Sequence, residues 1–232
     1  MARINAQYNV ARPGSLPVRI AAKMRLVMYD EFLARCAPSR TDTILDVGVT
    51  SEDAYAASNY LEAWYPHKDG LTACGIDDCS FLQAKYPGLR FVRADGRALP
   101  FADGTFDFVH SSAVLEHVGN RGMQGRFLAE LRRVARRGVF FTTPNRWFPI
   151  EFHSVLPLLH WLPPSAFRAS LRLLGHAELA DEAHLNLLTS AQVRSLCASA
   201  MTDGVVTVDC VHLCGWPSNI IGHWRESRMP DR

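Results

Sequence analysis

The segment Thr43-Ile44-Leu45-Asp46-Val47-Gly48 decides the fold, together with the later segment Ala73-Cys74-Gly75-Ile76-Asp77-Asp78. Each is a short apolar run that ends in glycine or an acid, which is typical of a buried parallel strand that delivers a loop to a ligand. As the first two strands of a doubly wound sheet, they predict a nucleotide-binding site. The glycine turn would let the backbone approach the ligand closely. The acid after the second strand would accept hydrogen bonds from ribose hydroxyls.

The residues after Gly48 argue against a dinucleotide ligand. A dinucleotide fingerprint requires G-x-G-x-x-G, whereas this chain reads Gly48-Val49-Thr50-Ser51-Glu52-Asp53. Two acids stand where phosphates would meet a helix N-terminus, and their charge disfavours a pyrophosphate there. A cationic adenosine ligand therefore fits this turn better. A nicotinamide-dependent oxidoreductase stays open as an alternative, because it shares the acid after the second strand.

Apolar patterning predicts an alternation of strands and helices along the chain. Strands are expected at 43–48, 71–76, 89–93, 106–110 and 139–142, and helices at 16–36, from Ser51 to Trp64, and around 127–134. Two later β-like runs, 204–211 and 218–224, can complete the sheet. The sequence therefore predicts an α/β fold with a doubly wound, mostly parallel seven-stranded sheet and helices on both faces.

The chain changes character after the fifth predicted strand. Residues 144–188 contain five prolines and a strongly apolar run. A stretch this long between sheet elements predicts a folded, helical and hydrophobic cap rather than a loop. Within it, a helix is expected from Pro164 to Gly175. Thr189-Ser190-Ala191-Gln192 then matches a capping box, which predicts another helix that ends near Ala200.

The composition is that of an ordinary globular protein, with 48% apolar and 21% charged residues. A net charge of +2 is too small to favour nucleic acid or an anionic membrane as a partner. The six cysteines are scattered and are typical of reduced, buried thiols. No signal-peptide pattern begins the chain, and no uncharged run reaches the about 20 residues of a membrane span. We therefore expect a cytoplasmic protein.

Four motifs follow one another on the predicted strand ends. They are Ile44-Leu45-Asp46-Val47-Gly48, Gly75-Ile76-Asp77, residues 93–101, and residues 106–118. In this order they resemble the class I S-adenosylmethionine-dependent methyltransferases, in particular the small-molecule type 11 group. The resemblance covers about 41–145 and implies a Rossmann-like fold with S-adenosyl-L-methionine as the cofactor. The chain departs from the family's pattern at Val49-Thr50-Ser51, where further glycines are usual.

The resemblance implies roles for the acids and the glycine of these motifs. Asp46 and Gly48 would shape the turn beneath the methionine part of the cofactor. Asp77 would bind the ribose hydroxyls in preference to its neighbour Asp78, and Asp95 would lie near the adenine amino group. Each acid also has a plainer interpretation as a turn or capping residue, and Gly48 has one as a packing residue.

The resemblance also implies that the end of the fourth strand lines the cofactor opposite the substrate, through Ser111, Ser112 and Ala113. The whole chain, 1–232, is then expected to form a single methyltransferase domain. Its parts would be an N-terminal helical segment (1–40), a cofactor-binding core (41–145), a cap or substrate region (146–200) and the final strands (201–232).

Histidines are the candidate catalytic residues. Methyl transfer from a sulfonium is an in-line displacement, so the protein mainly aligns the reactants and excludes water. If the acceptor is a hydroxyl, a histidine near neutral pKa is the natural general base. His117, just after the fourth strand, and His153, in the cap, are the candidates. We expect packing roles for His160 and His184.

No metal is expected from the sequence. Glu151 with His153 hints at a ligand pair, as does Cys210-Val211-His212-Leu213-Cys214. Neither is accompanied by a second ligand pair at the spacing of zinc sites. Buried strand cysteines are the commoner explanation of the second motif.

The leading hypothesis is an S-adenosylmethionine-dependent methyltransferase that acts on a small-molecule or biosynthetic-precursor acceptor, with oxygen as the preferred atom. The apolar run 146–162 would close the pocket as a lid. Alternatively, it forms an interfacial surface that admits a lipid-linked or sugar-containing acceptor. The turn after Gly48 leaves open a non-catalytic binding or scaffold protein of the same fold.

Overall fold

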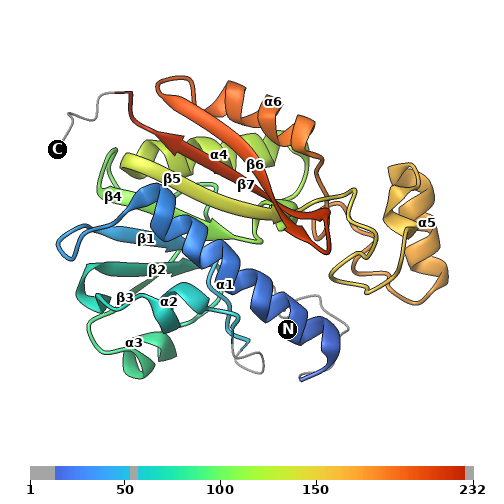
Figure 1. Cartoon of the computed structure of the whole chain (residues 1–232), viewed down its shortest axis with the longest axis horizontal. Coiled ribbons are helices and arrows are strands. Elements are labelled where there is room, and N and C mark those ends of the chain that lie inside the picture. Colours follow the sequence, from blue (N-terminus) through green and yellow to red (C-terminus); the bar gives the residue numbers. More distant parts are fainter. Residues whose placement is uncertain (1–13, 53–56, 228–232) are drawn as a thin grey trace.

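A seven-stranded sheet forms the centre of the protein in a computed structural model, which describes residues 14–52 and 57–227 (Figure 1). The strand order is β3-β2-β1-β4-β5-β7-β6. The strands are β1 (Ile44–Val47), β2 (Leu71–Gly75), β3 (Arg90–Arg93), β4 (Phe106–Ser112), β5 (Ala135–Pro144), β6 (Val205–Leu213) and β7 (Trp216–Arg225). The first five pair in parallel, whereas β7 runs antiparallel to both of its neighbours. The predicted fold class and all seven strand positions are confirmed to within a few residues.

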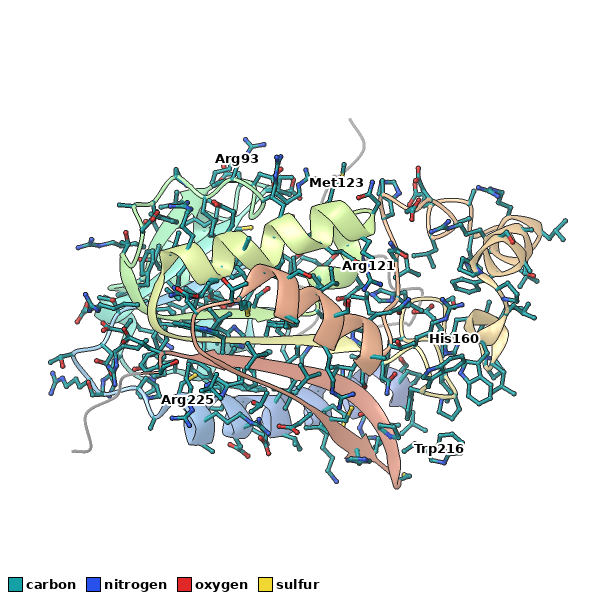
Figure 2. The ribbon with its side chains drawn as sticks, turned by 90° about the horizontal axis from the view of Figure 1, so that it is seen from above. Arg93, Arg121, Met123, His160, Trp216 and Arg225 are labelled. Atoms are coloured by element: carbon teal, nitrogen blue, oxygen red, sulfur yellow. The ribbon has the colours of Figure 1, made fainter. Side chains whose placement is uncertain are left out.

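Helices cover both faces of the sheet, as Figure 2 shows from above. The first helix, α1 (Leu16–Cys36), packs against β5 and β6 on one face, and α4 (Arg121–Val134) and α6 (Ser190–Ala200) lie together on the other. Each face has its own apolar core, and Phe32 on one side and Phe127 on the other are almost completely buried. The predicted helix at 16–36 is therefore correct at both ends.

The strand order creates a crevice at the carboxyl ends of the central strands. The chain leaves β1 towards β2 on one side and returns through β3 to β4 on the other side of β1. At such a switch point the connections diverge to opposite sides and leave an open space beyond the strand ends. The turn after Gly48 and the residues after β4 face this space.

The helix expected from Ser51 does not begin there. Among the described residues of this stretch, only α2 (Tyr60–Trp64) is helical. Asn59 explains the difference, because its side chain binds the backbone of Thr50 twice. Its Oδ1 accepts from the Thr50 N–H and its Nδ2 donates to the Thr50 carbonyl, each at 2.9 Å. These bonds fix the backbone at Thr50, and residues 50–52 are not helical. Asp53, expected in the first helical turn, lies outside the described residues.

Two short helical elements lie between β5 and α6. They are a 3₁₀ turn, η3 (Leu159–Trp161), and α5 (Pro164–Leu173), which lies apart from the sheet in Figure 1. This segment has a small apolar cluster of its own that includes Phe167 and Leu171. The predicted capping box is confirmed, because Thr189 and Gln192 bond each other's backbone N–H at the start of α6. Within the described residues, no helix has both the length and the apolar character needed to cross a bilayer.

Candidate active site

A cavity of about 580 Å³ occupies the crevice at the switch point. It is bounded by the ends of the central strands, by one side of α1 and by the segment that follows β5. Its volume lies within the range of small-molecule sites. Six of the nine residues predicted for the site line it: Gly48, Asp95, Ser112, Ala113, His117 and His153. Asp46, Asp77 and Ser111 do not belong to its lining.

Gly48 forms the floor of the cavity in a conformation that requires glycine. Its φ is +109°, and its N–H donates to the carbonyl of Cys74 at 2.7 Å. A Cβ at this position would lie 2.1 Å from Cγ2 of Val114. The turn therefore has neither the backbone freedom nor the space for a side chain, and it exposes backbone to the cavity. This cradle fits a ligand that approaches the main chain closely, as the adenosyl cofactor would.

Asp46 lies beneath the cavity in a buried polar network. Its Oδ1 is 2.6 Å from Nδ1 of His110, and Nε2 of His110 is 2.8 Å from the Tyr60 hydroxyl. Burial lowers the pKa of His110 to about 4, so the imidazole is neutral. It therefore donates from Nδ1 to Asp46 and accepts from Tyr60. Asp46 supports the turn from below and does not face the cavity.

A second buried acid, Glu62, belongs to the same network. Burial raises the pKa of Asp46 to about 7 and that of Glu62 well above its ordinary value, with the charge of Asp46 adding to the shift of Glu62. Neither carboxyl oxygen of Glu62 has a hydrogen-bond partner among the described residues, and burial beside Asp46 favours its neutral form. His110, Tyr60 and Glu62 were not predicted. The register of β1 and β4 places Asp46 opposite His110, so correct strand pairing alone would have revealed that contact.

The two acids expected to bind adenosine differ in their surroundings. Asp77 follows β2 directly and is half-buried beside the cavity-lining residues Gly75 and Ile76. Its neighbour Asp78 is exposed and accepts from the Ser80 N–H at 2.9 Å. Asp95 lines the cavity and binds the Arg97 guanidinium at 2.7 Å. Hydrogen bonds from Arg97 lower the pKa of Asp95, so this carboxylate stays ionised.

The end of β4 is held by three hydrogen bonds. Ser111 donates to the carbonyl of Val47 at 2.8 Å, which ties β4 to β1. The hydroxyls of Ser112 and Thr142 are 2.9 Å apart, and the Ala113 N–H donates to the Thr142 carbonyl at 2.9 Å. Ala113 has a φ of +55°, which is uncommon for a residue with a side chain. This bend turns the chain sharply across the cavity.

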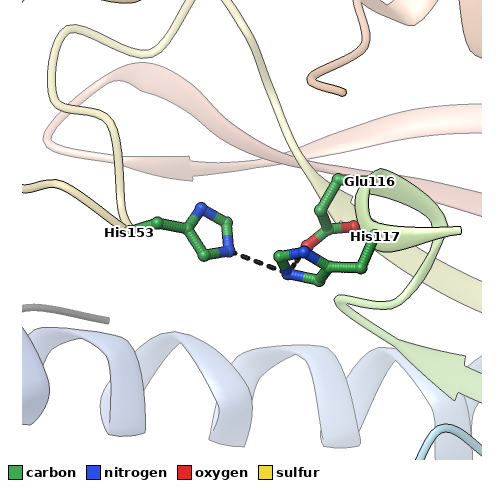
Figure 3. A group of neighbouring side chains, drawn as sticks. All are labelled: Glu116, His117 and His153. Carbon is green, nitrogen blue, oxygen red and sulfur yellow. Dashed lines mark hydrogen bonds and ion pairs between the residues drawn. The ribbon is translucent and has the colours of Figure 1, made fainter. Parts of the chain in front are cut away.

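A cluster of three side chains lies at the other end of the cavity (Figure 3). Glu116 and His117 come from the turn after β4, and His153 comes from the segment after β5. The Nε2 atoms of the two histidines are 3.0 Å apart. The Oε1 atom of Glu116 is 3.8 Å from Nε2 of His117. The two predicted catalytic histidines, 36 residues apart in the sequence, are thus direct neighbours.

Each histidine is oriented by an acceptor at its other nitrogen. Nδ1 of His117 is 2.5 Å from the carbonyl oxygen of His184, and Nδ1 of His153 is 2.6 Å from Oε1 of Glu151. A carbonyl oxygen can only accept, so His117 carries its proton on Nδ1 and directs the Nε2 lone pair towards His153. Burial lowers the pKa of His117 to about 3, and the neighbouring His153 adds to this effect.

Glu151 is a buried carboxylate that the sequence did not assign to catalysis. Burial opposes its ionisation, but attraction to His153 and hydrogen bonds from His153 and Ser154 outweigh that effect and hold its pKa at about 2. Burial similarly opposes protonation of His153, and the charge and hydrogen bond of Glu151 reverse this and raise its pKa. Of the other two histidines, His160 bonds the Phe148 carbonyl at 2.7 Å, whereas His184 lines the cavity.

Comparison with known proteins agrees with this geometry. Residues 58–143 match the methyltransferase domain family. The chain is 32% identical over 168 residues to a demethylmenaquinone methyltransferase of a Roseiflexus species, which covers 69% of this chain and 65% of the relative. It is 39% identical over 106 residues to an uncharacterized methyltransferase of Mycolicibacterium gilvum, which covers 43% of this chain and 37% of the relative. The chain thus spans between about a third and two thirds of the length of these relatives.

A solved structure shares the fold over nearly the whole chain. It is a SAM-dependent methyltransferase of Aquifex aeolicus, with a TM-score of 0.54 and 16% identity, and the superposition covers 90% of this chain and 97% of that one. At this identity the similarity speaks for the fold alone. The domain match and the sequence relatives support a class I S-adenosylmethionine-dependent methyltransferase, and the solved structure agrees in fold.

Proposed function

We propose that the protein transfers the methyl group of S-adenosyl-L-methionine to an oxygen atom of a small-molecule or biosynthetic-precursor acceptor. One observation carries this proposal. The Gly48 turn and the His117–His153 pair, which have opposite tasks in such a reaction, line the same cavity. A ligand seated on the turn and an acceptor beside the histidines would therefore meet without solvent between them, which is the arrangement that in-line transfer requires.

The cofactor end would be held by residues at the ends of β1, β2 and β4. Gly48 would offer its backbone and Asp95 would lie beside the adenine. Asp77 is outside the lining but follows the lining residue Ile76, and it would accept from the ribose hydroxyls. Asp46 and Ser111 would act from below by fixing the turn and the β1–β4 edge, since neither lines the cavity. When bound, the cofactor supplies an electrophilic methyl group on a sulfonium.

The proposed acceptor end combines the histidines, Arg25 and Glu151 with apolar side chains. Phe148, Ile150, Phe152 and Val155 from the segment after β5 line it together with Met24 and Met28 of α1. This lining fits an acceptor with an apolar part, and the Roseiflexus relative is named for demethylmenaquinone. The imidazoles would accept the hydroxyl proton as the oxygen–methyl bond forms and the sulfur–methyl bond breaks.

Binding of S-adenosylhomocysteine tests the cofactor assignment. We expect it to raise the melting temperature of the protein and to bind in isothermal titration calorimetry. Asp77→Ala should weaken binding by about 10- to 100-fold, because hydrogen bonds to a charged acceptor contribute about 1.5–3 kcal/mol. Asp78→Ala is the matched control, since Asp78 is exposed and bonded to Ser80, and it should bind as the wild type does. A folded wild-type protein that shows neither a shift in melting temperature nor heat of binding with S-adenosylhomocysteine would overturn the proposal.

Turnover separates an enzyme from a scaffold of the same fold. We expect methyl-labelled cofactor to label hydroxyl-containing acceptors in a metabolite extract, and His117→Asn to abolish that labelling while binding persists. Binding without any labelled product would support the scaffold.

A second candidate acceptor is lipid-linked, and an exposed aromatic group favours it. The rings of Trp147 and Trp216 each lie about 6 Å from that of Trp161, at 6.2 and 6.5 Å, and the first two are half exposed. Aromatic side chains of this kind insert at membrane surfaces. Liposome flotation should capture the protein, and Trp147→Glu with Trp216→Glu should release it. Equal flotation of both proteins would remove this candidate.

A further inference from the structure

The cluster of Glu116, His117 and His153 has the geometry of a metal site. We propose that these three side chains bind one divalent transition-metal ion of the Zn²⁺ type at the acceptor end of the cavity. The proposal rests on the proposed function and refines it: the ion would lie where the acceptor hydroxyl is expected and, in place of the imidazoles as base, would favour loss of the hydroxyl proton to solvent by lowering the pKa of the hydroxyl. It stands on the positions of the ligand atoms and on the hydrogen bonds that hold them.

The two imidazoles present the correct atoms to a common point. Both Nδ1 atoms are taken by oxygen acceptors, so both Nε2 atoms face each other at 3.0 Å. A metal ion between or beside the rings would allow both imidazoles to be neutral, with both Nε2 lone pairs directed at it. With metal–nitrogen bonds of about 2.1 Å, nitrogens 3.0 Å apart subtend about 90° at the ion. That angle is normal for ligands of one metal.

Glu116 provides the third ligand, and a nearby cation would stabilise its buried carboxyl group. Its carboxyl is fully buried; Oε2 accepts from the Thr143 hydroxyl at 2.8 Å, but Oε1 has no hydrogen-bond partner among the described residues. A buried carboxylate oxygen without a partner is costly unless a cation compensates it. This oxygen is directed at the histidines, and all three ligand atoms lie within 4.8 Å of one another (Figure 3). Two ligand atoms at the tetrahedral angle around one ion lie about 3.4 Å apart, so a widest separation of up to 4.8 Å would have to contract by up to about 1.4 Å when the ion binds.

The supporting shell is that of a metal site as well. Metal-bound histidines usually donate their second N–H to a carboxylate or a backbone carbonyl. His153 contacts the carboxylate of Glu151 through Nδ1, and His117 contacts the backbone carbonyl of His184 through Nδ1. With a divalent cation bound, both buried glutamates, Glu116 and Glu151, could be ionised and both imidazoles neutral, and the charges would balance. Two imidazoles with one carboxylate are a ligand set that favours Zn²⁺ and its neighbours over Mg²⁺ or Ca²⁺.

Sequence reasoning expected no metal because it looked for ligand pairs at fixed local spacing. Glu116 and His117 are adjacent, and the third ligand lies 36 residues further on in a different segment. Two of the ligands, His117 and His153, line the cavity. The remaining coordination positions of the ion would therefore face the space in which an oxygen ligand, such as water or the acceptor hydroxyl, would lie.

Metal titration of the full chain tests the site. The protein is stripped with a chelator, dialysed and titrated with Zn²⁺ by calorimetry, and Co²⁺ is added separately as an absorption probe. We expect one ion per chain. Glu116→Gln should weaken Zn²⁺ binding more than about 100-fold, which exceeds the usual effect of an outer-shell change. His153→Asn should do the same, because its amide can still donate to Glu151 but its Nε2 is removed. His212→Ala, which deletes an exposed imidazole of β6, should leave Zn²⁺ affinity unchanged.

The same samples are titrated with S-adenosylhomocysteine, so that the two proposals fail separately. Variants that lose Zn²⁺ but keep S-adenosylhomocysteine binding support the site and show that they are folded. Saturable S-adenosylhomocysteine binding with no Zn²⁺ binding, or equal Zn²⁺ affinity in wild type, Glu116→Gln and His153→Asn, would overturn the metal site alone. A proton would then take the place of the cation, with His153 as an imidazolium between Glu151 and His117.

Discussion

Gly48→Ala should damage both stability and cofactor binding, and the structure separates the two causes of the loss. The first cause is backbone strain, since a φ of +109° costs a residue with a side chain about 1–3 kcal/mol. The second is a clash, since the new Cβ would lie 2.1 Å from Cγ2 of Val114, and overpacking of this kind costs about 1–3 kcal/mol. The sum of about 2–6 kcal/mol is a large part of the about 5–15 kcal/mol that stabilises a typical domain.

Two further variants isolate these terms. Gly175 also has a positive φ, +83°, but a Cβ added there would meet no described atom within 4 Å, so Gly175→Ala should show backbone strain alone. Adding Val114→Ala to Gly48→Ala removes the clashing methyl group and should restore about 1–3 kcal/mol. Urea denaturation gives the free energy of unfolding of the wild type and the three variants. Calorimetry with S-adenosylhomocysteine gives the effect of each change on ligand affinity. The predicted clash with Val114 is refuted by either of two results. One is that Gly48→Ala loses no more free energy of unfolding than Gly175→Ala, and the other is that adding Val114→Ala to Gly48→Ala recovers none of the loss.

Three other predictions concern the stability of the Thr50 turn, the pH dependence of stability, and the role of Glu151 beside the proposed metal ligands. Asn59→Ala removes both bonds to the Thr50 backbone and should cost about 1–3 kcal/mol in urea denaturation, with weaker S-adenosylhomocysteine binding; an unchanged affinity would contradict the role of Asn59 in holding the turn. Burial lowers the pKa of His223 to about 4, so stability that is present above pH 6.5 is lost as pH falls towards 4. His223→Gln should therefore lose about 1–3 kcal/mol less than wild type between these pH values, and parallel stability curves would refute this. Glu151→Gln should weaken Zn²⁺ binding by about 10- to 100-fold, less than Glu116→Gln does, and a reversed order would contradict the ligand assignment.

The strands could be predicted from sequence because burial alone specifies them. All four residues of β1 are buried, and β4 is buried over six of its seven residues, so their apolar runs reflect a single dominant force. The helix expected from Ser51 failed for the opposite reason. Its start was inferred from local capping chemistry, whereas the hydrogen bonds of Asn59, nine positions along the chain, fix the turn as a loop. A local pattern cannot anticipate such a contact.

The polar contacts of the site were the least predictable part. His110 belongs to an apolar strand and was not singled out, yet it binds Asp46 from 64 residues away because the strands align these two residues. His117 and His153 were selected individually as bases, but their contact with each other and with Glu116 depends on how the segment after β5 folds back. Residue type and strand position indicated where chemistry could occur. The partners of each group followed only from tertiary structure.

The two ends of the cavity therefore depend on different parts of the chain. The proposed cofactor end is built by the sheet: Asp46, His110 and Ser111 are fixed by strand register and are buried. The proposed acceptor end is completed by His153 and Glu151 from the segment after β5. Changes in the segment after β5 can thus alter the acceptor without disturbing the Gly48 turn. Acceptor choice in this protein is consequently expected to reside in the segment after β5, and the pair of His117 with His153 joins that segment to the scaffold of the sheet.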